Sequence, residues 1–91
     1  MDSERLLKIN DSLWRSAHGE YSYTYGQCIA YEEIDLAINE CNSERSLVIR
    51  LNKVIRDLEQ NRLEAIDIED ERMFSGEIDA IKEFKKKLKE K

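Results

Sequence analysis

The sequence contains no proline and only three glycines in 91 residues. Proline breaks helices and glycine destabilises them, so helices in this chain should meet few internal interruptions. The strong helix formers Leu, Glu, Lys and Arg are frequent, and only Glu20 to Tyr25 alternates polar and aromatic residues as a strand would. We therefore predict an all-α protein, with residues 1–91 forming a single helical domain.

Cysteine and histidine are also scarce. Cys28 and Cys41 fall on one predicted helix, about 20 Å apart at roughly 1.5 Å rise per residue, which is too far for a disulfide. We interpret both as small core side chains in a reducing compartment. Together with His18 they match no zinc spacing, and no Glu-x-x-His motif of a bundle di-metal site is present. We therefore expect neither a metal nor a cofactor.

Targeting signals and enzyme motifs are missing as well. The start of the chain lacks a basic segment followed by an apolar run, and no window approaches eighteen apolar residues. No phosphate-binding glycine loop or nucleophile elbow is present. Glu32, Glu33 and Asp35 lie close together, but neighbouring acids on a helix are commonly solvated rather than catalytic. The expectation is a cytoplasmic, non-enzymatic protein that does not bind membranes.

The charge balance points to the kind of partner. Twenty acidic and fifteen basic residues give a net charge of −5. Proteins that bind nucleic acid generally do so by neutralising phosphates with Lys and Arg, so direct nucleic-acid binding is disfavoured and a basic protein partner is favoured. A chain this short leaves apolar surface uncovered, which favours a homodimer.

The centre of the chain, from Gly26 to Asn61, reads as two helices joined at Asn42-Ser43. A band of small and aliphatic residues follows helical spacing before the break, at Gly26, Ala30, Ile34, Ala37, Ile38 and Cys41. After it, Leu47, Leu51, Val54 and Leu58 form a second stripe. We predict a bundle of about four helices built on this antiparallel hairpin, in which the helix that follows in sequence packs on the small residues.

The expected helix ends follow from capping residues. Ser3 is the predicted cap of a first helix running to about Ser16, after which His18-Gly19 stops it. The second helix should run from about Tyr25 to Cys41, and the third should begin at Glu44. Its end is expected near Asp67, because Ile66 and Ile68 do not share a helical face. Asp70 is the predicted cap of the last helix, whose apolar stripe is Phe74, Ile78, Ile81, Phe84 and Leu88.

A faint repeat relates two of these helices at an offset of fifty residues. Gly26, Ala30 and Glu33 align with Gly76, Ala80 and Glu83, and the aliphatic Ile34 and Ile38 align with Phe84 and Leu88. Each segment places glycine one turn before alanine. Both helices can therefore be approached closely by another backbone.

The last ten residues carry a cluster of lysines: Lys82, Lys85, Lys86, Lys87, Lys89 and Lys91. Three interpretations are open. The cluster complements the dipole at a helix C-terminus, or it contacts nucleic acid or anionic lipid, or it pairs head to tail with the acidic segment from Asp57 to Glu71 of a second copy.

The aromatic residues near the start have two interpretations. Tyr21 and Tyr25 would stack one turn apart if Glu20 to Tyr25 begins the second helix or precedes it as a loop. Alternatively, the tyrosines and nearby Trp14 form a contact patch, because Tyr and Trp are enriched where interfaces concentrate binding energy.

These observations favour an acidic helical protein-interaction module, in its sharper form an inhibitor of the phage or mobile-element type that covers a basic or nucleic-acid-binding partner. The candidate partner-binding residues are Trp14, Tyr21, Tyr23, Tyr25, Glu32, Glu33, Asp35, Asp67, Glu69, Asp70 and Glu71. The alternative is an oligomeric nucleotide-binding protein that uses the three tyrosines with Arg15 and Arg50. A helix-turn-helix regulator at Cys41 to Ser43 is disfavoured, because the helix after it interleaves its few basic residues with acids.

Overall fold

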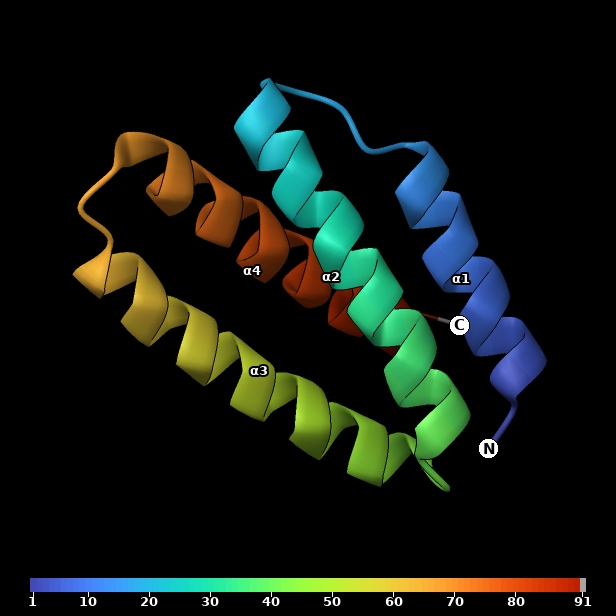
Figure 1. The fold of residues 1–91 in the computed structure, drawn as a ribbon. Helices are drawn as coiled ribbons and strands as arrows, with labels where there is room; N and C mark the ends of the chain where they lie inside the picture. Colours follow the sequence, from blue (N-terminus) through green and yellow to red (C-terminus); the bar gives the residue numbers. More distant parts are fainter. Residues whose placement is uncertain (91) are drawn as a thin grey trace.

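The computed structural model describes residues 1–90 and consists of four helices joined by short turns (Figure 1). They are α1 (Ser3–Arg15), α2 (Tyr21–Glu40), α3 (Glu44–Glu64) and α4 (Ile68–Lys89). No strand occurs within the described range. The predicted all-α fold and the bundle of about four helices are confirmed.

The turn between α2 and α3 has the predicted cap. Ser43 Oγ accepts a hydrogen bond from Ser46 N at 3.1 Å, and Ser46 Oγ accepts one from Ser43 N at 3.3 Å. These reciprocal bonds satisfy two donors that the first turn of α3 leaves free. Glu44 is therefore the first residue of α3, as expected.

Two other caps differ from the prediction by one and three residues. Asp2, not Ser3, caps α1, because its Oδ1 accepts from Arg5 N at 3.1 Å. Asp67, not Asp70, caps α4, because its Oδ1 accepts from Glu69 N at 2.8 Å. In both cases the acid that directly precedes the helix reaches the free amides, and the predicted cap lies inside the helix.

Helix α2 begins at Tyr21, four residues earlier than the predicted start at Tyr25. Tyr21 and Tyr25 stack with their ring centroids 6.2 Å apart, as the one-turn spacing predicted. Gly19 does not stop α1, which is capped at Ser16; with φ of 131° it lies in the connection to α2, in a backbone conformation that favours glycine. The alternation of tyrosine and polar residues therefore belongs to a helix.

The closest neighbour of α2 is α4, and the prediction that the small residues pack on the next helix in sequence is wrong. A Cβ added to Gly26 would lie 2.0 Å from the carbonyl oxygen of Met73, and one added to Gly76 would lie 2.1 Å from that of Tyr23. Only glycine allows backbones to come this close. Helices α2 and α3 instead meet near their turn and diverge, with α4 lying behind them (Figure 1).

One apolar core receives side chains from all four helices. Leu6, Ile34, Leu51 and Phe84, one from each helix in order, are fully buried. Cys28 and Cys41, predicted to be core residues, are free and only partly buried. Cys41, at the C-cap of α2, packs against the edge of the core, whereas Cys28 is not part of it.

Candidate protein-interaction surface

Trp14 and Tyr23 are partly buried against neighbouring helices rather than forming an open aromatic patch. The Trp14 ring lies 6.1 Å from that of Tyr31 between centroids, and both side chains are largely covered. Tyr23 donates a hydrogen bond to Asp79 Oδ2 at 2.6 Å. Burial, together with this bond, raises the pKa of Tyr23 to about 12. Both aromatic residues therefore connect helices.

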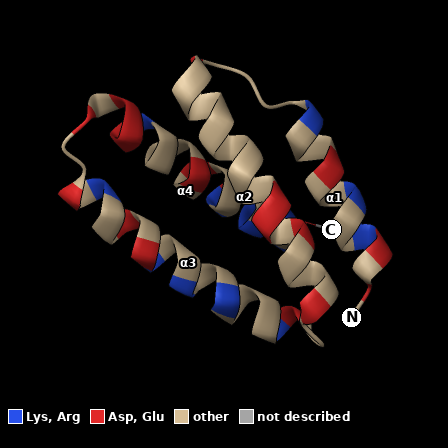
Figure 2. Cartoon of the chain, in the orientation of Figure 1, with Lys and Arg blue, Asp and Glu red and all other residues tan. Residues whose placement is uncertain are grey.

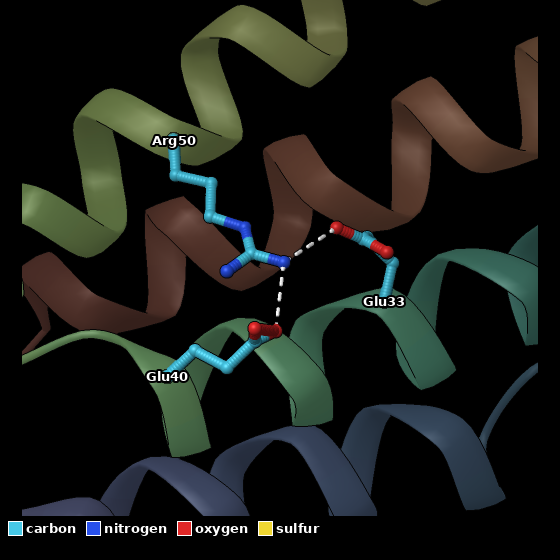
Figure 3. Close-up of polar contacts among 3 residues, drawn as sticks. All are labelled: Glu33, Glu40 and Arg50. Atoms are coloured by element: carbon cyan, nitrogen blue, oxygen red, sulfur yellow. Dashed lines mark hydrogen bonds and ion pairs between the residues drawn. The ribbon is translucent and has the colours of Figure 1, made fainter.

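Glu33 is held by an ion-pair network between α2 and α3. Arg50 Nη2 donates to Glu33 Oε1 and to Glu40 Oε1, each at 3.2 Å (Figure 3). Burial lowers the pKa of Arg50, but the bonds to Glu40 and Glu33 outweigh it and raise the pKa above its ordinary value. The network connects the two helices near their shared turn, which leaves Glu33 poorly placed for an external partner.

Asp35 connects α2 to α1. Its Oδ1 accepts from Asn10 Nδ2 at 2.7 Å, and the same amide donates to the Tyr31 carbonyl at 2.9 Å. Asn10 is fully buried and was not among the candidate residues predicted from the sequence. The sequence spacing indicates its burial, because Asn10 lies between Leu6 and Leu13 at the four- and three-residue steps of the core face of α1.

Four of the remaining candidate acids, Asp67, Glu69, Asp70 and Glu71, lie with exposed apolar residues where α3 passes into α4. We call the segment from Leu63 to Glu71 the acidic corner. Leu63, Ile66 and Ile68 are 81%, 102% and 59% exposed. Around them lie the carboxylates of Glu64, Asp67, Glu69, Asp70 and Glu71, and Figure 2 shows acidic residues along this turn and the first turn of α4. Within residues 1–90, none of these five acids forms an ion pair.

The two exposed tyrosines lie at the same end of the bundle. Glu20, just before α2, pairs with Arg72 in the second turn of α4, which brings the starts of the two helices together. Tyr21 is 82% exposed and Tyr25 is 49% exposed. The structure thus gathers six of the eleven candidates, Tyr21, Tyr25 and the four acids between Asp67 and Glu71, at one end. Glu32 is exposed but lies farther along α2.

The residues of the nucleotide-binding alternative are mostly engaged in other contacts. Arg15 Nε lies 3.0 Å from Asp11 Oδ2, and Arg50 belongs to the network with Glu33 and Glu40. Tyr23 is bonded to Asp79. Of the five suspected residues, only Tyr21 and Tyr25 have no polar side-chain partner within residues 1–90.

No group of three or more His, Cys, Asp or Glu side chains is placed to hold a metal ion among residues 1–90. None of the four helices combines the length and apolar composition needed to cross a bilayer. Lys91, part of the predicted lysine cluster, lies outside the described residues. Comparisons with protein-family models, curated proteins and solved structures gave no match.

Proposed function

We propose that this chain is a cytoplasmic, non-enzymatic protein-interaction module whose acidic corner, flanked by Tyr21 and Tyr25, binds a basic surface of another protein. The supporting observation is the combination found at the corner. Three large aliphatic side chains protrude among five carboxylates that have no cation partner within residues 1–90.

A purely structural role accounts for only part of this surface. Acids in the first turn of α4 interact favourably with the helix dipole, and Asp67 caps the helix. Neither effect requires Leu63, Ile66 and Ile68 to face solvent. Apolar side chains ringed by charges of one sign are typical of a surface that is covered by a partner of opposite charge.

In the sharper form of the proposal, the covered surface is a basic groove with which the partner binds nucleic acid. The module would then act as an inhibitor by occupying that groove. Charge complementarity would speed the encounter, and the affinity would fall as salt screens it. We also propose that the module forms a homodimer.

The test uses a fluorescent amphipathic helical peptide with lysines along one face and leucines along the other. Anisotropy titrations compare the wild type with a Glu69→Lys/Glu71→Lys corner variant and a Glu32→Lys/Asp57→Lys control, which changes the net charge equally. We expect the corner variant to bind at least tenfold more weakly and the control to resemble the wild type. Wild-type affinity should also fall strongly between about 50 mM and about 300 mM salt.

Two outcomes would contradict the proposal. Equal losses in both variants would mean that net charge, not the corner, attracts the peptide. Equal affinity at both salt concentrations would remove the electrostatic argument. Circular dichroism of each variant checks that the helices remain folded.

A further inference from the structure

The cations of this protein divide into a paired and an unpaired group. Six of them lie within 4.0 Å of a carboxylate: Arg5, Lys8, Arg15, Arg50, Arg72 and Lys87. In the part of the chain that the structure describes, every Lys or Arg side chain without such a partner lies on α3 or α4. In a chain of net charge −5, this arrangement leaves one hairpin with unpaired basic side chains.

Three of these unpaired cations surround a groove between α3 and α4. The groove has a volume of about 510 Å³ and is lined by Ile49, Asn52, Ile55, Arg56, Lys82 and Lys85. Lys85 Nζ donates to Asn52 Oδ1, and this hydrogen bond connects the Lys85 side chain on α4 to α3. Ile55 is 7% exposed and Ile49 is 59% exposed, so the groove also offers apolar surface. Among the described residues, no carboxylate side chain lines it.

We infer that this basic groove receives the acidic corner of a second copy of the chain, and that two copies pair reciprocally in a closed dimer. The inference rests on the proposed function, because it names a basic surface that the corner fits. The two surfaces are complementary: apolar Ile66 with surrounding carboxylates on one side, and apolar Ile49 and Ile55 with surrounding cations on the other.

The positions of the two surfaces favour a closed pair over an open chain of copies. Both belong to the α3–α4 hairpin, and on α3 they are separated by the stretch from Asn52 to Leu63, about 17 Å at roughly 1.5 Å rise per residue. Two hairpins placed side by side in opposite directions would therefore present corner to groove twice, which is the symmetry of most homodimers.

A protein corner suits this groove better than nucleic acid does. The unpaired carboxylates of the corner and the net charge of −5 repel a long polyanion, which carries a phosphate at every step. A folded corner brings a few acids to the groove together with an aliphatic tip. The two contacts are small, so we expect a dissociation constant of about 10–100 μM at low salt.

The test combines two charge reversals. The groove variant is Arg56→Glu/Lys82→Glu/Lys85→Glu, and the corner variant is Glu69→Lys/Glu71→Lys. Sedimentation equilibrium at about 50 mM salt should show wild-type dimers, and each variant alone should associate at least tenfold more weakly. An equimolar mixture of the two variants should dimerise again. One contact then joins an unchanged acidic corner to an unchanged basic groove, and the other brings the two new lysines to the three new glutamates. Lys53→Glu/Lys86→Glu, which alters cations that do not line the groove, is the control.

Several results would overturn the inference. The inference is wrong if the wild type is monomeric at every concentration or if the groove variant dimerises normally. It is also wrong if the mixture of variants stays monomeric, or if species larger than the dimer form. A monomeric wild type that binds a single-stranded oligonucleotide through the groove would assign the groove to nucleic acid instead.

The peptide titration separates this inference from the proposed function. The groove variant keeps an intact corner, so it should bind the basic peptide at least as well as the wild type once the competing self-contact is lost. If it does so while its dimerisation is unchanged, the self-pairing is wrong and the partner-binding role of the corner stands. If dimerisation depends on the groove but neither the wild type nor the groove variant binds the peptide through the corner, the self-pairing stands and the partner-binding role of the corner is wrong.

Discussion

Gly26 and Gly76 pack on each other's helices in a reciprocal way. Gly26 meets the carbonyl of Met73, and Gly76 meets the carbonyl of Tyr23. Tyr23 and Met73 are themselves fifty positions apart, as the two glycines are. Contacts that exchange in this manner are those of a local pseudo-two-fold axis between α2 and α4. The faint sequence repeat therefore coincides with a symmetric helix crossing.

The neighbouring positions follow the same relation. Ala30 and Ala80 are each 1% exposed, and Ile34 and Phe84 are both fully buried. The bundle thus consists of two hairpins, α1–α2 and α3–α4, whose second helices cross at the glycines (Figure 1).

The first prediction concerns this crossing. Gly26→Ala and Gly76→Ala should each lower the free energy of unfolding by about 1–3 kcal/mol, because a Cβ forces the two backbones apart. The loss should appear although alanine favours an isolated helix by roughly 1 kcal/mol. Urea denaturation is the measurement, and Asn39→Ala on the exposed side of α2 is the control. Stabilisation by either glycine substitution would show that the helices do not cross so closely.

The second prediction concerns Glu77, which occupies the position equivalent to Gln27. Burial raises the pKa of its carboxyl from 4.5 to about 7. Below pH 4.5 the group is protonated in both the folded and the unfolded chain. Between pH 4.5 and about 7 the unfolded chain loses its proton first, so the free energy of unfolding falls as the pH rises.

Glu77→Gln removes this penalty. Because the carboxylate is partly hydrated, we expect a gain of only about 1–2 kcal/mol at pH 8, and no gain at pH 4. Thermal unfolding at both pH values is the measurement, with Glu32→Gln at an exposed position as the control. A gain of the same size at pH 4 would show that packing, not ionisation, limits stability at this site.

The third prediction concerns Asn10. Asn10→Asp would replace two amide donors with a carboxylate that faces Asp35 and the Tyr31 carbonyl, both of them acceptors. A buried charge without a partner should cost about 3 kcal/mol or more at pH 7, and less at pH 4, where the carboxyl can be protonated. Thermal unfolding at both pH values measures the effect.

Two control variants separate the effect of the buried charge in Asn10→Asp from the loss of the Asn10 hydrogen bonds. Asn61→Asp, at an exposed position of α3, should change little. Asn10→Ala should be destabilising to the same extent at both pH values, since it removes the bonds without adding a charge. A loss in Asn10→Asp that is independent of pH would mean that Asn10 is not enclosed as the structure places it.

The helical character of the chain was predictable because it depends on interactions between residues close in sequence. The absence of proline, the Ser43 cap and the apolar stripe of the last helix all act within one or two turns. The acidic segment and the exposed tyrosine pair were also recognisable before the structure was known.

The partners of these helices were decided by packing between residues far apart in sequence. The glycine band predicted that some backbone approaches α2, but spacing within α2 does not distinguish α3 from α4, and the glycine of α4 is the one that matches. Likewise, Glu33 and Asp35 resemble any surface acids until Arg50 and Asn10 reach them from other helices. Local spacing determined which side chains share a face, and the tertiary structure decided which of those faces remain open to solvent.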